Sequence, residues 1–113
     1  MPTVFERIIA REIPAAIVHE DEWTVAFHDI HPQAPFHVLV VPRKAIPRLQ
    51  DAGPEDAEIL GRMLLAARKV AAAAGMGESG FRCTLNEGPD AGQVVPHVHL
   101  HVLAGRAFGW PPG

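Results

Sequence analysis

The most constraining feature of the sequence is a strict alternation of histidine with aliphatic residues near the C-terminus, over residues 97–103. Successive side chains of a β-strand point to opposite faces, so His97, His99 and His101 are expected to share one face. The intervening aliphatic side chains then lie on the other face, within a hydrophobic core. The segment therefore predicts a sheet with one apolar face and one face that carries imidazoles.

The rest of the chain predicts the elements that complete such a sheet. Residues 4–9 have apolar side chains at helical spacing and predict a short amphipathic helix. Residues 54–74 predict a long helix, whose apolar stripe includes Leu64 and Ala74. The order of elements indicates an α+β fold, an antiparallel sheet with helices packed on one side. The predicted strands are residues 16–19, 23–28, 36–41, 81–86 and 97–103.

Length and charge exclude several classes of protein. A chain of 113 residues suits one domain, and we expect residues 1–113 to form it. The net charge is -3 and Lys and Arg are not clustered, so phosphate-driven binding of DNA or RNA is not expected. No apolar run approaches the roughly 20 residues of a membrane span. The single cysteine, Cys83, and the absence of a signal-peptide pattern favour a cytoplasmic protein.

The histidine run is open to three interpretations. A solvent-facing strand would accept Thr, Lys or Glu equally well. A zinc site is limited by geometry, because the outer histidines of a strand are about 13 Å apart and a third ligand, such as His37, would be needed. Nucleophilic catalysis fits better, since imidazole attacks phosphorus at neutral pH and neighbouring imidazoles favour a neutral central ring.

Residues 97–103 also match the signature of the histidine triad (HIT) family, and the similarity continues along the chain. Upstream, residues 27–30, 32–35 and 41–44 resemble the Hint branch of that family. Residues 86–88 and 92–93 resemble its loop before the triad, and residues 105–106 and 110–113 resemble its C-terminus. The resemblance covers essentially the whole chain and is highly specific.

The resemblance implies a fold and an activity. The implied HIT-like fold is a five-stranded antiparallel sheet with two helices per subunit, and two subunits pair into a homodimer with a ten-stranded sheet. The implied activity is hydrolysis of purine nucleoside 5′-phosphoramidates, derivatives of AMP or GMP, through a covalent nucleotidyl-histidine intermediate. The alternatives are a nucleotide-binding module with weak turnover and a dinucleoside polyphosphate hydrolase. No cofactor is expected; zinc could bind without being required.

The same resemblance implies roles for individual residues. His99 is the implied nucleophile, His101 contacts the phosphate and the leaving group, and His97 and His37 support the nucleophile. The other histidines, His19, His28 and His31, receive no catalytic role. The implied substrate-binding residues are Asp29 at the ribose, Phe5, Ile8 and Ile30 around the base, Asn86, Gly92 and Gln93 on the phosphate side, Val94 near the leaving group, and Trp110 in the tail.

Three positions depart from the pattern of the branch. Val94 stands where a Ser or Thr hydroxyl usually assists the leaving group. Pro96 replaces an aromatic residue, and Gly109 stands where histidine is common. These departures bear on substrate preference and turnover more than on the class of reaction.

Overall fold

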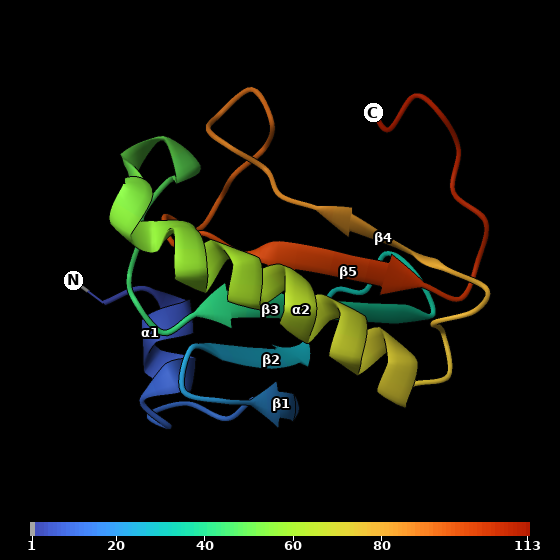
Figure 1. The fold of residues 1–113 in the computed structure, drawn as a ribbon, viewed down its shortest axis with the longest axis horizontal. Coiled ribbons are helices and arrows are strands. Elements are labelled where there is room, and N and C mark those ends of the chain that lie inside the picture. The colour runs from blue at the N-terminus through green and yellow to red at the C-terminus, as the bar shows by residue number, and fades with distance from the viewer. Residues whose placement is uncertain (1) are drawn as a thin grey trace.

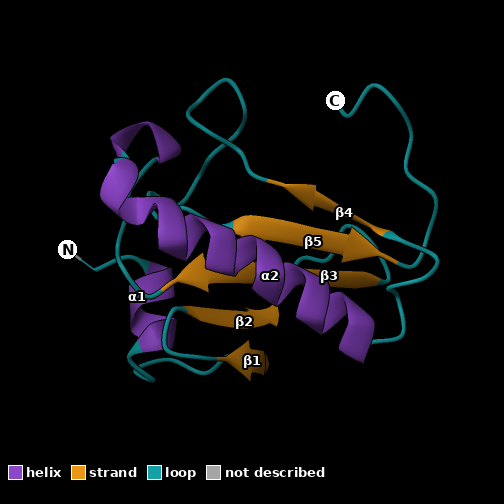
Figure 2. Ribbon diagram, viewed as in Figure 1, coloured by secondary structure: helices purple, strands orange, loops and turns teal. Residues whose placement is uncertain are grey.

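A computed structural model describes residues 2–113, which fold into an antiparallel sheet with two α-helices (Figures 1 and 2). The five strands lie in the order β1-β2-β3-β5-β4, so β5 is inserted between β3 and β4. The predicted α+β class and the five-stranded antiparallel sheet are therefore confirmed. The elements are α1 Val4–Ile9, β1 Ile17–Glu20, β2 Thr24–His28, β3 Phe36–Pro42, α2 Ala57–Ala73, β4 Phe81–Thr84 and β5 Leu100–Ala104, with 3-10 turns at Leu49–Asp51 and Pro54–Asp56.

The short helix α1 is fixed at its N-terminus by a capping box. The Thr3 hydroxyl accepts from the Glu6 backbone N–H (3.1 Å), and the Glu6 carboxylate accepts from the Thr3 backbone N–H (2.9 Å). These two bonds satisfy N–H groups that have no partner within the helix. The helix buries Phe5 and Ile8 against the sheet, which confirms the amphipathic helix predicted over residues 4–9.

The long helix α2 crosses one face of the sheet (Figure 1). The predicted helix at residues 54–74 was wrong at both ends, because residues 54–56 form a 3-10 turn and Ala74 is an exposed C-cap. The predicted stripe was also wrong at Leu64, which is 57% exposed because it projects about 100° away from Met63 on the helix. Neither helix described in residues 2–113 is long and apolar enough to cross a membrane. The side chains that α2 buries are Ile59, Met63, Ala66, Ala67, Val70 and Ala71.

The last strand begins later than predicted. Pro96 has no N–H group, and the Val98 N–H donates to the Ile46 carbonyl (2.7 Å), which lies outside the sheet. His97 and His99 therefore precede β5, and only His101 lies within it. The predicted strand at residues 81–86 also ends early, at Thr84, which pairs with His101 near the start of β5.

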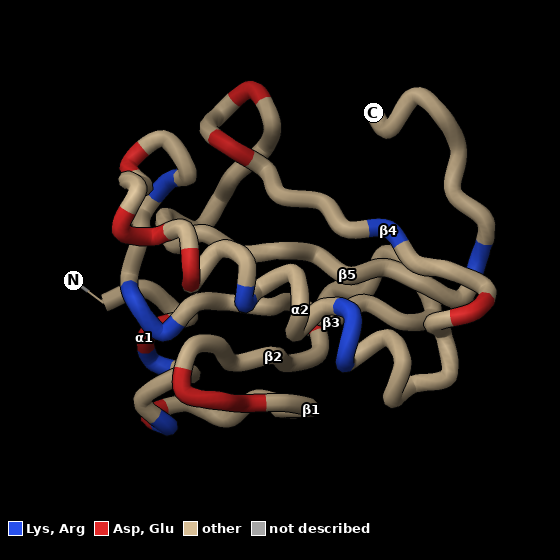
Figure 3. The backbone as a smooth tube through the Cα atoms, viewed as in Figure 1, with Lys and Arg blue, Asp and Glu red and all other residues tan. Residues whose placement is uncertain are grey.

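The sheet separates two hydrophobic clusters. The cluster under α2 contains Val38, Val40 and Val102, and the alternation predicted for residues 97–103 holds because Val98 and Leu100 join it. The opposite cluster joins α1 to Phe27 and Leu39. The prediction that the helices pack on one side of the sheet was therefore wrong, because α1 and α2 cover opposite faces. The central strands β3 and β5 carry no Lys, Arg, Asp or Glu, and the charges lie around them (Figure 3). Ionisable groups within these two strands are therefore histidines alone.

Candidate active site

A cavity of about 690 Å³ opens on the face of the sheet opposite α2. Its walls come from α1, from the loop between β2 and β3, and from the segments that flank β4 and β5. Most of the residues implied by the family resemblance meet here. Those that line it are Phe5, Ile8, Asp29, Ile30, His37, Asn86, Gly92, Val94, His99 and His101.

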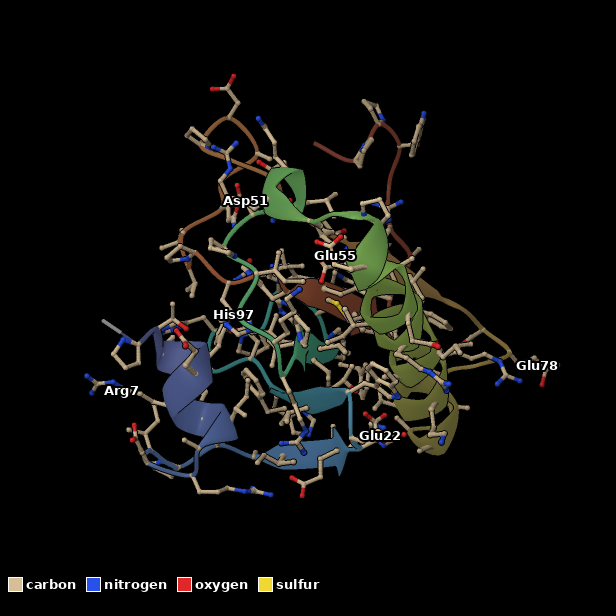
Figure 4. The ribbon with its side chains drawn as sticks, turned by 60° about the vertical axis from the view of Figure 1, so that its left-hand side comes forward. Arg7, Glu22, Asp51, Glu55, Glu78 and His97 are labelled. Carbon is tan, nitrogen blue, oxygen red and sulfur yellow. The ribbon has the colours of Figure 1, made fainter. Side chains whose placement is uncertain are left out.

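His97 lies behind this cavity and does not line it. Its side chain is fully buried, in the interior near α1, whereas Arg7 and Glu78 project outward (Figure 4). The ring donates from Nε2–H to the Pro42 carbonyl (2.9 Å), and Nδ1 is buried without a partner among the described residues. Burial lowers the pKa of His97, so this ring is neutral and contributes packing.

His99 is held in one tautomer by the backbone. Its Nδ1 lies 2.8 Å from the carbonyl oxygen of His97, and because a carbonyl only accepts, Nδ1 carries the proton. The other nitrogen, Nε2, then keeps an unprotonated lone pair. The ring is 8% exposed, lines the cavity and packs edge-on against Phe5 at 5.0 Å between centroids. Such a nitrogen can act as a nucleophile.

His37 and His101 are hydrogen-bonded to each other, and the tautomers of both rings are also defined. The Gln33 backbone N–H donates to His37 Nδ1 (3.0 Å), so the proton of the neutral His37 ring lies on Nε2. That Nε2–H donates to His101 Nδ1 (2.8 Å), which leaves the His101 proton on Nε2. Burial, with His99 and His37 nearby, lowers the pKa of His101 to about 4, and burial lowers that of His37. His101 is therefore neutral and offers its Nε2–H as a hydrogen-bond donor, with its ring centroid 5.1 Å from that of His99.

The two carboxylate oxygens of Asp29 have different surroundings. Its Oδ1 accepts from the His31 backbone N–H (2.8 Å), which stabilises the turn that leads to Pro32. Its Oδ2 lies 3.4 Å from His37 Nε2, at the wall of the cavity. Ile30 follows with 86% of its surface exposed, so it forms the mouth of the cavity.

In the loop after β4, some residues line the cavity and others hold the loop in place. Arg48 donates from Nε to the Glu87 carboxylate (2.6 Å), which holds the loop against the rest of the chain. The Gln93 amide is fully used, since its oxygen accepts from the Gly88 N–H (3.0 Å) and its nitrogen donates to two backbone carbonyls. Gln93 thus lies outside the cavity that Asn86 reaches, and its amide supports the loop in this structure.

Two further placements differ from sequence-based expectation. Trp110 is 84% exposed and does not line the cavity of this protomer. His28 and His31, which received no role, both line the cavity rim. Nothing in the histidine spacing marks them, because the turn at Asp29 sets their placement. Neither makes a contact that assigns it chemistry.

Asp29, His37 and His101 bring three potential metal ligands within 4.8 Å of one another. The tautomers do not suit a bound ion. A neutral histidine that binds metal through Nε2 carries its proton on Nδ1, but His37 Nδ1 already accepts from the Gln33 N–H. A metal ion on His37 Nε2 would put the ring proton on Nδ1, where it would face the Gln33 backbone N–H, and two donors cannot bond to each other. The residues present therefore do not fit a resident metal ion.

Comparisons with known proteins agree on one family. The family model described as "HIT domain" matches residues 10–108. An uncharacterized HIT-like protein of Synechocystis is 55% identical over 111 residues, 98% of this chain and 96% of that protein. A 14 kDa zinc-binding protein of Zea mays is 46% identical over 114 residues, 99% of this chain and 88% of that protein.

Solved structures show the same similarity. A HIT family hydrolase from Legionella pneumophila superimposes with a TM-score of 0.96 at 45% identity, covering 99% of this chain and 100% of that chain. A histidine triad nucleotide-binding protein from Candida albicans superimposes with a TM-score of 0.83 at 32% identity, covering 97% of this chain and 83% of that chain. The similarity extends over the elements that build the cavity.

Proposed function

The chain belongs to the HIT domain family, and from that premise we propose that it hydrolyses purine nucleoside 5′-phosphoramidates, as the Hint branch does. The observation that carries the proposal is the pair of opposed tautomers in the cavity. His99 Nε2 has a lone pair because its Nδ1–H is bound to a carbonyl, while His101 Nε2 carries a proton. A nucleophile beside a hydrogen-bond donor suits cleavage of a P–N bond, because the donor can stabilise the departing nitrogen.

In the first half-reaction, His99 Nε2 attacks the phosphorus and the bond from phosphorus to the leaving nitrogen breaks. That nitrogen takes one proton from solvent and departs as a neutral amine, while the His101 Nε2–H donates a hydrogen bond to it. His99 Nδ1–H keeps its bond to the His97 carbonyl (2.8 Å), which stabilises the positive charge that develops on the ring. The products are a free amine and a nucleotidyl group on His99.

In the second half-reaction, water attacks the same phosphorus and the bond to His99 breaks. The attacking water releases one proton to solvent, and the His101 Nε2–H donates a hydrogen bond to the phosphate. The nucleoside 5′-monophosphate is released, and His99 returns to its initial tautomer. No step in this cycle requires a metal ion, and we propose that the reaction proceeds without a cofactor.

The lining of the cavity supports a nucleotide substrate. The Asp29 carboxylate can accept hydrogen bonds from two neighbouring ribose hydroxyls through its Oδ2. Phe5, Ile8 and Ile30 offer apolar surface to a purine ring, and Asn86 lies on the side of His101. The similar protein from Candida albicans is called a histidine triad nucleotide-binding protein, in agreement with this assignment.

We also propose that the protein is a homodimer joined through β4. This strand is an edge of the sheet, and unpaired edges favour pairing with another strand. Pairing two copies of β4 would give the ten-stranded sheet of the Hint branch and leave Trp110 free to reach the partner. Light scattering should give about twice the subunit mass of 12.2 kDa. A monomer at micromolar concentration would contradict this proposal.

The activity is tested with adenosine and guanosine 5′-phosphoramidates in the presence of a chelator. We expect release of the amine and the 5′-monophosphate, with a burst of amine if hydrolysis of the intermediate is slower than its formation. Dinucleoside polyphosphates form the comparison arm. Turnover of these compounds but not of phosphoramidates would contradict the proposal, and binding without turnover would favour the binding-module alternative.

A further inference from the structure

A second hollow, of about 340 Å³, lies beside the first and meets it at His101. Gln33, His37, Asn86 and His101 line both, whereas His99 lines only the first. The outer wall of the second hollow comes from β4, from the end of β5 and from the C-terminal tail. The side chains found only in this second hollow are those of Arg82, Thr84, Leu103, Arg106, Phe108 and Pro112.

This placement identifies what the hollow can receive. Attacking and leaving atoms lie roughly in line across the phosphorus, so the leaving group points away from His99. The hydrogen-bond donor His101 must touch the leaving nitrogen, and it faces both hollows. A nucleotide in the first hollow would therefore place its leaving group in the second. This step rests on the proposed function.

The second hollow is positively charged. Arg82 and Arg106 line it, and its lining contains neither Asp nor Glu. Neither guanidinium lies within ion-pair distance of a carboxylate among residues 2–113. The arginines that do form ion pairs, Arg11, Arg48 and Arg62, lie outside the lining of the hollow. Two unneutralised arginines beside a ligand space favour an anion.

The two arginines are also held in place. Both guanidinium groups lie over the Phe108 ring, at 5.2 Å for Arg82 and 4.3 Å for Arg106. Arg82 donates to the Gly109 carbonyl (2.8 Å), and Arg106 donates to the Gln33 carbonyl (3.1 Å). Each guanidinium has five N–H groups, so donors remain for a ligand after these bonds.

We propose that Arg82 and Arg106 select leaving amines that carry a carboxylate, such as an amino acid joined to phosphorus through its nitrogen. The register supports this assignment, because Thr84 pairs with His101 and Arg82 pairs with Leu103 on the same side of the sheet. Arg82 is thus two residues along β4 from Thr84, which lies opposite His101. An anion on the leaving amine would meet a charge-assisted hydrogen bond there.

The test compares two adenosine 5′-phosphoramidates, of phenylalanine and of phenethylamine, which differ only by the carboxylate. The measured quantity is the ratio of their kcat/KM values. Arg82→Gln and Arg106→Gln should each lower this ratio about tenfold, the effect of losing one charged hydrogen bond. Arg82→Lys should recover part of it. Arg68→Gln, which removes an exposed charge from α2, should leave the ratio unchanged.

The outcomes separate this inference from the proposed function. An unchanged ratio in both glutamine variants, or an equal fall in Arg68→Gln, would overturn the carboxylate assignment alone. Diadenosine polyphosphate is a third substrate, and an arginine effect confined to it would assign the hollow to phosphate and overturn the inference. Failure of the unmodified protein to turn over both phosphoramidates would overturn the proposed function and this inference with it.

Discussion

The two faces of the sheet are built from the same strands but differ in composition: one is apolar and packs under α2, and the other carries the histidines of the cavity. On the face under α2, Val38, Val40 and Val102 are fully buried and make only apolar contacts. On the opposite face, their neighbours His37 and His101 are hydrogen-bonded to each other beside a cavity. One face fills space, while the other fixes the position of protons.

The difference shows where stability and chemistry are separated. Buried polar groups are costly unless they find partners, and the histidine face meets this cost with bonds to backbone carbonyls and N–H groups. Those same bonds set the tautomers of His99 and His101. The apolar face carries no such constraint on protons. Substitutions on the two faces should therefore fail in different ways.

The largest expected effect is on the histidine face. His99→Ala should lower turnover of an adenosine phosphoramidate by at least about 10³-fold, because it removes the nucleophile. The fold should be retained, because His99 borders an existing cavity and makes one side-chain hydrogen bond. Binding of AMP, measured by calorimetry, should be retained. Near-normal turnover would contradict the role assigned to His99.

The matching substitution on the apolar face is Met63→Ala. Met63 lies on α2, facing the sheet, and is 2% exposed, so truncation should leave a cavity and lower the free energy of unfolding by about 2–5 kcal/mol. Turnover per folded molecule should stay close to that of the unmodified protein. Urea denaturation and active-site titration measure the two quantities. A large fall in kcat of the folded fraction would show that the faces are coupled.

Acid should destabilise the protein through the histidine face. The pKa values of His37 and His97 are lowered, and that of His101 is lowered to about 4, so these rings stay neutral in the fold. The unfolded chain takes up protons on them below about pH 6.5, so stability should fall between pH 7 and pH 5. Asp21, with a pKa near 2, acts only at lower pH.

Urea denaturation at pH 7.5, 6 and 5 measures this acid effect, and His101→Asn should reduce the slope. Stability that stays constant or rises as the pH falls through this range would contradict the neutral histidine network.

The smallest expected effect concerns Val94, which is 87% exposed at the cavity. Val94→Thr adds a hydroxyl that can donate to a departing nitrogen, with a gain below the roughly 2.7–4 kcal/mol of an oxyanion-hole donor. We expect a several-fold faster single-turnover rate for alkyl phosphoramidates and little change for aryl or acyl leaving groups. An equal change for both classes would show that position 94 shapes the cavity instead.

Sequence alone was sufficient for the alternation of the two faces, because a period of two is a property of the extended backbone. It predicted the fold class, and the family resemblance predicted that His37, His99 and His101 share one site. It did not predict where β5 begins, which depends on the long-range bond from Val98 to Ile46. It also did not predict the exposure of Leu64, which depends on how α2 is rotated on the sheet.

The parts of the site that sequence missed depend on contacts between distant segments. Gln93 is polar and lies in a loop, so its sequence position is equally compatible with binding phosphate and with supporting the loop. Only its bonds to Gly88 and to two carbonyls show how its amide is used. Arg82 and Arg106 are 24 residues apart and meet through Phe108, which no local pattern reveals.

The central claim is that His99 carries the nucleotide during turnover. Its direct test is intact-protein mass spectrometry of a rapidly quenched reaction with an adenosine phosphoramidate, followed by fragmentation to locate the adduct. We predict a 12.2 kDa chain heavier by one adenylyl group, with the group on His99 and absent from His99→Ala. Full turnover with no adduct formed at any time, or an adduct on another residue, would contradict the account.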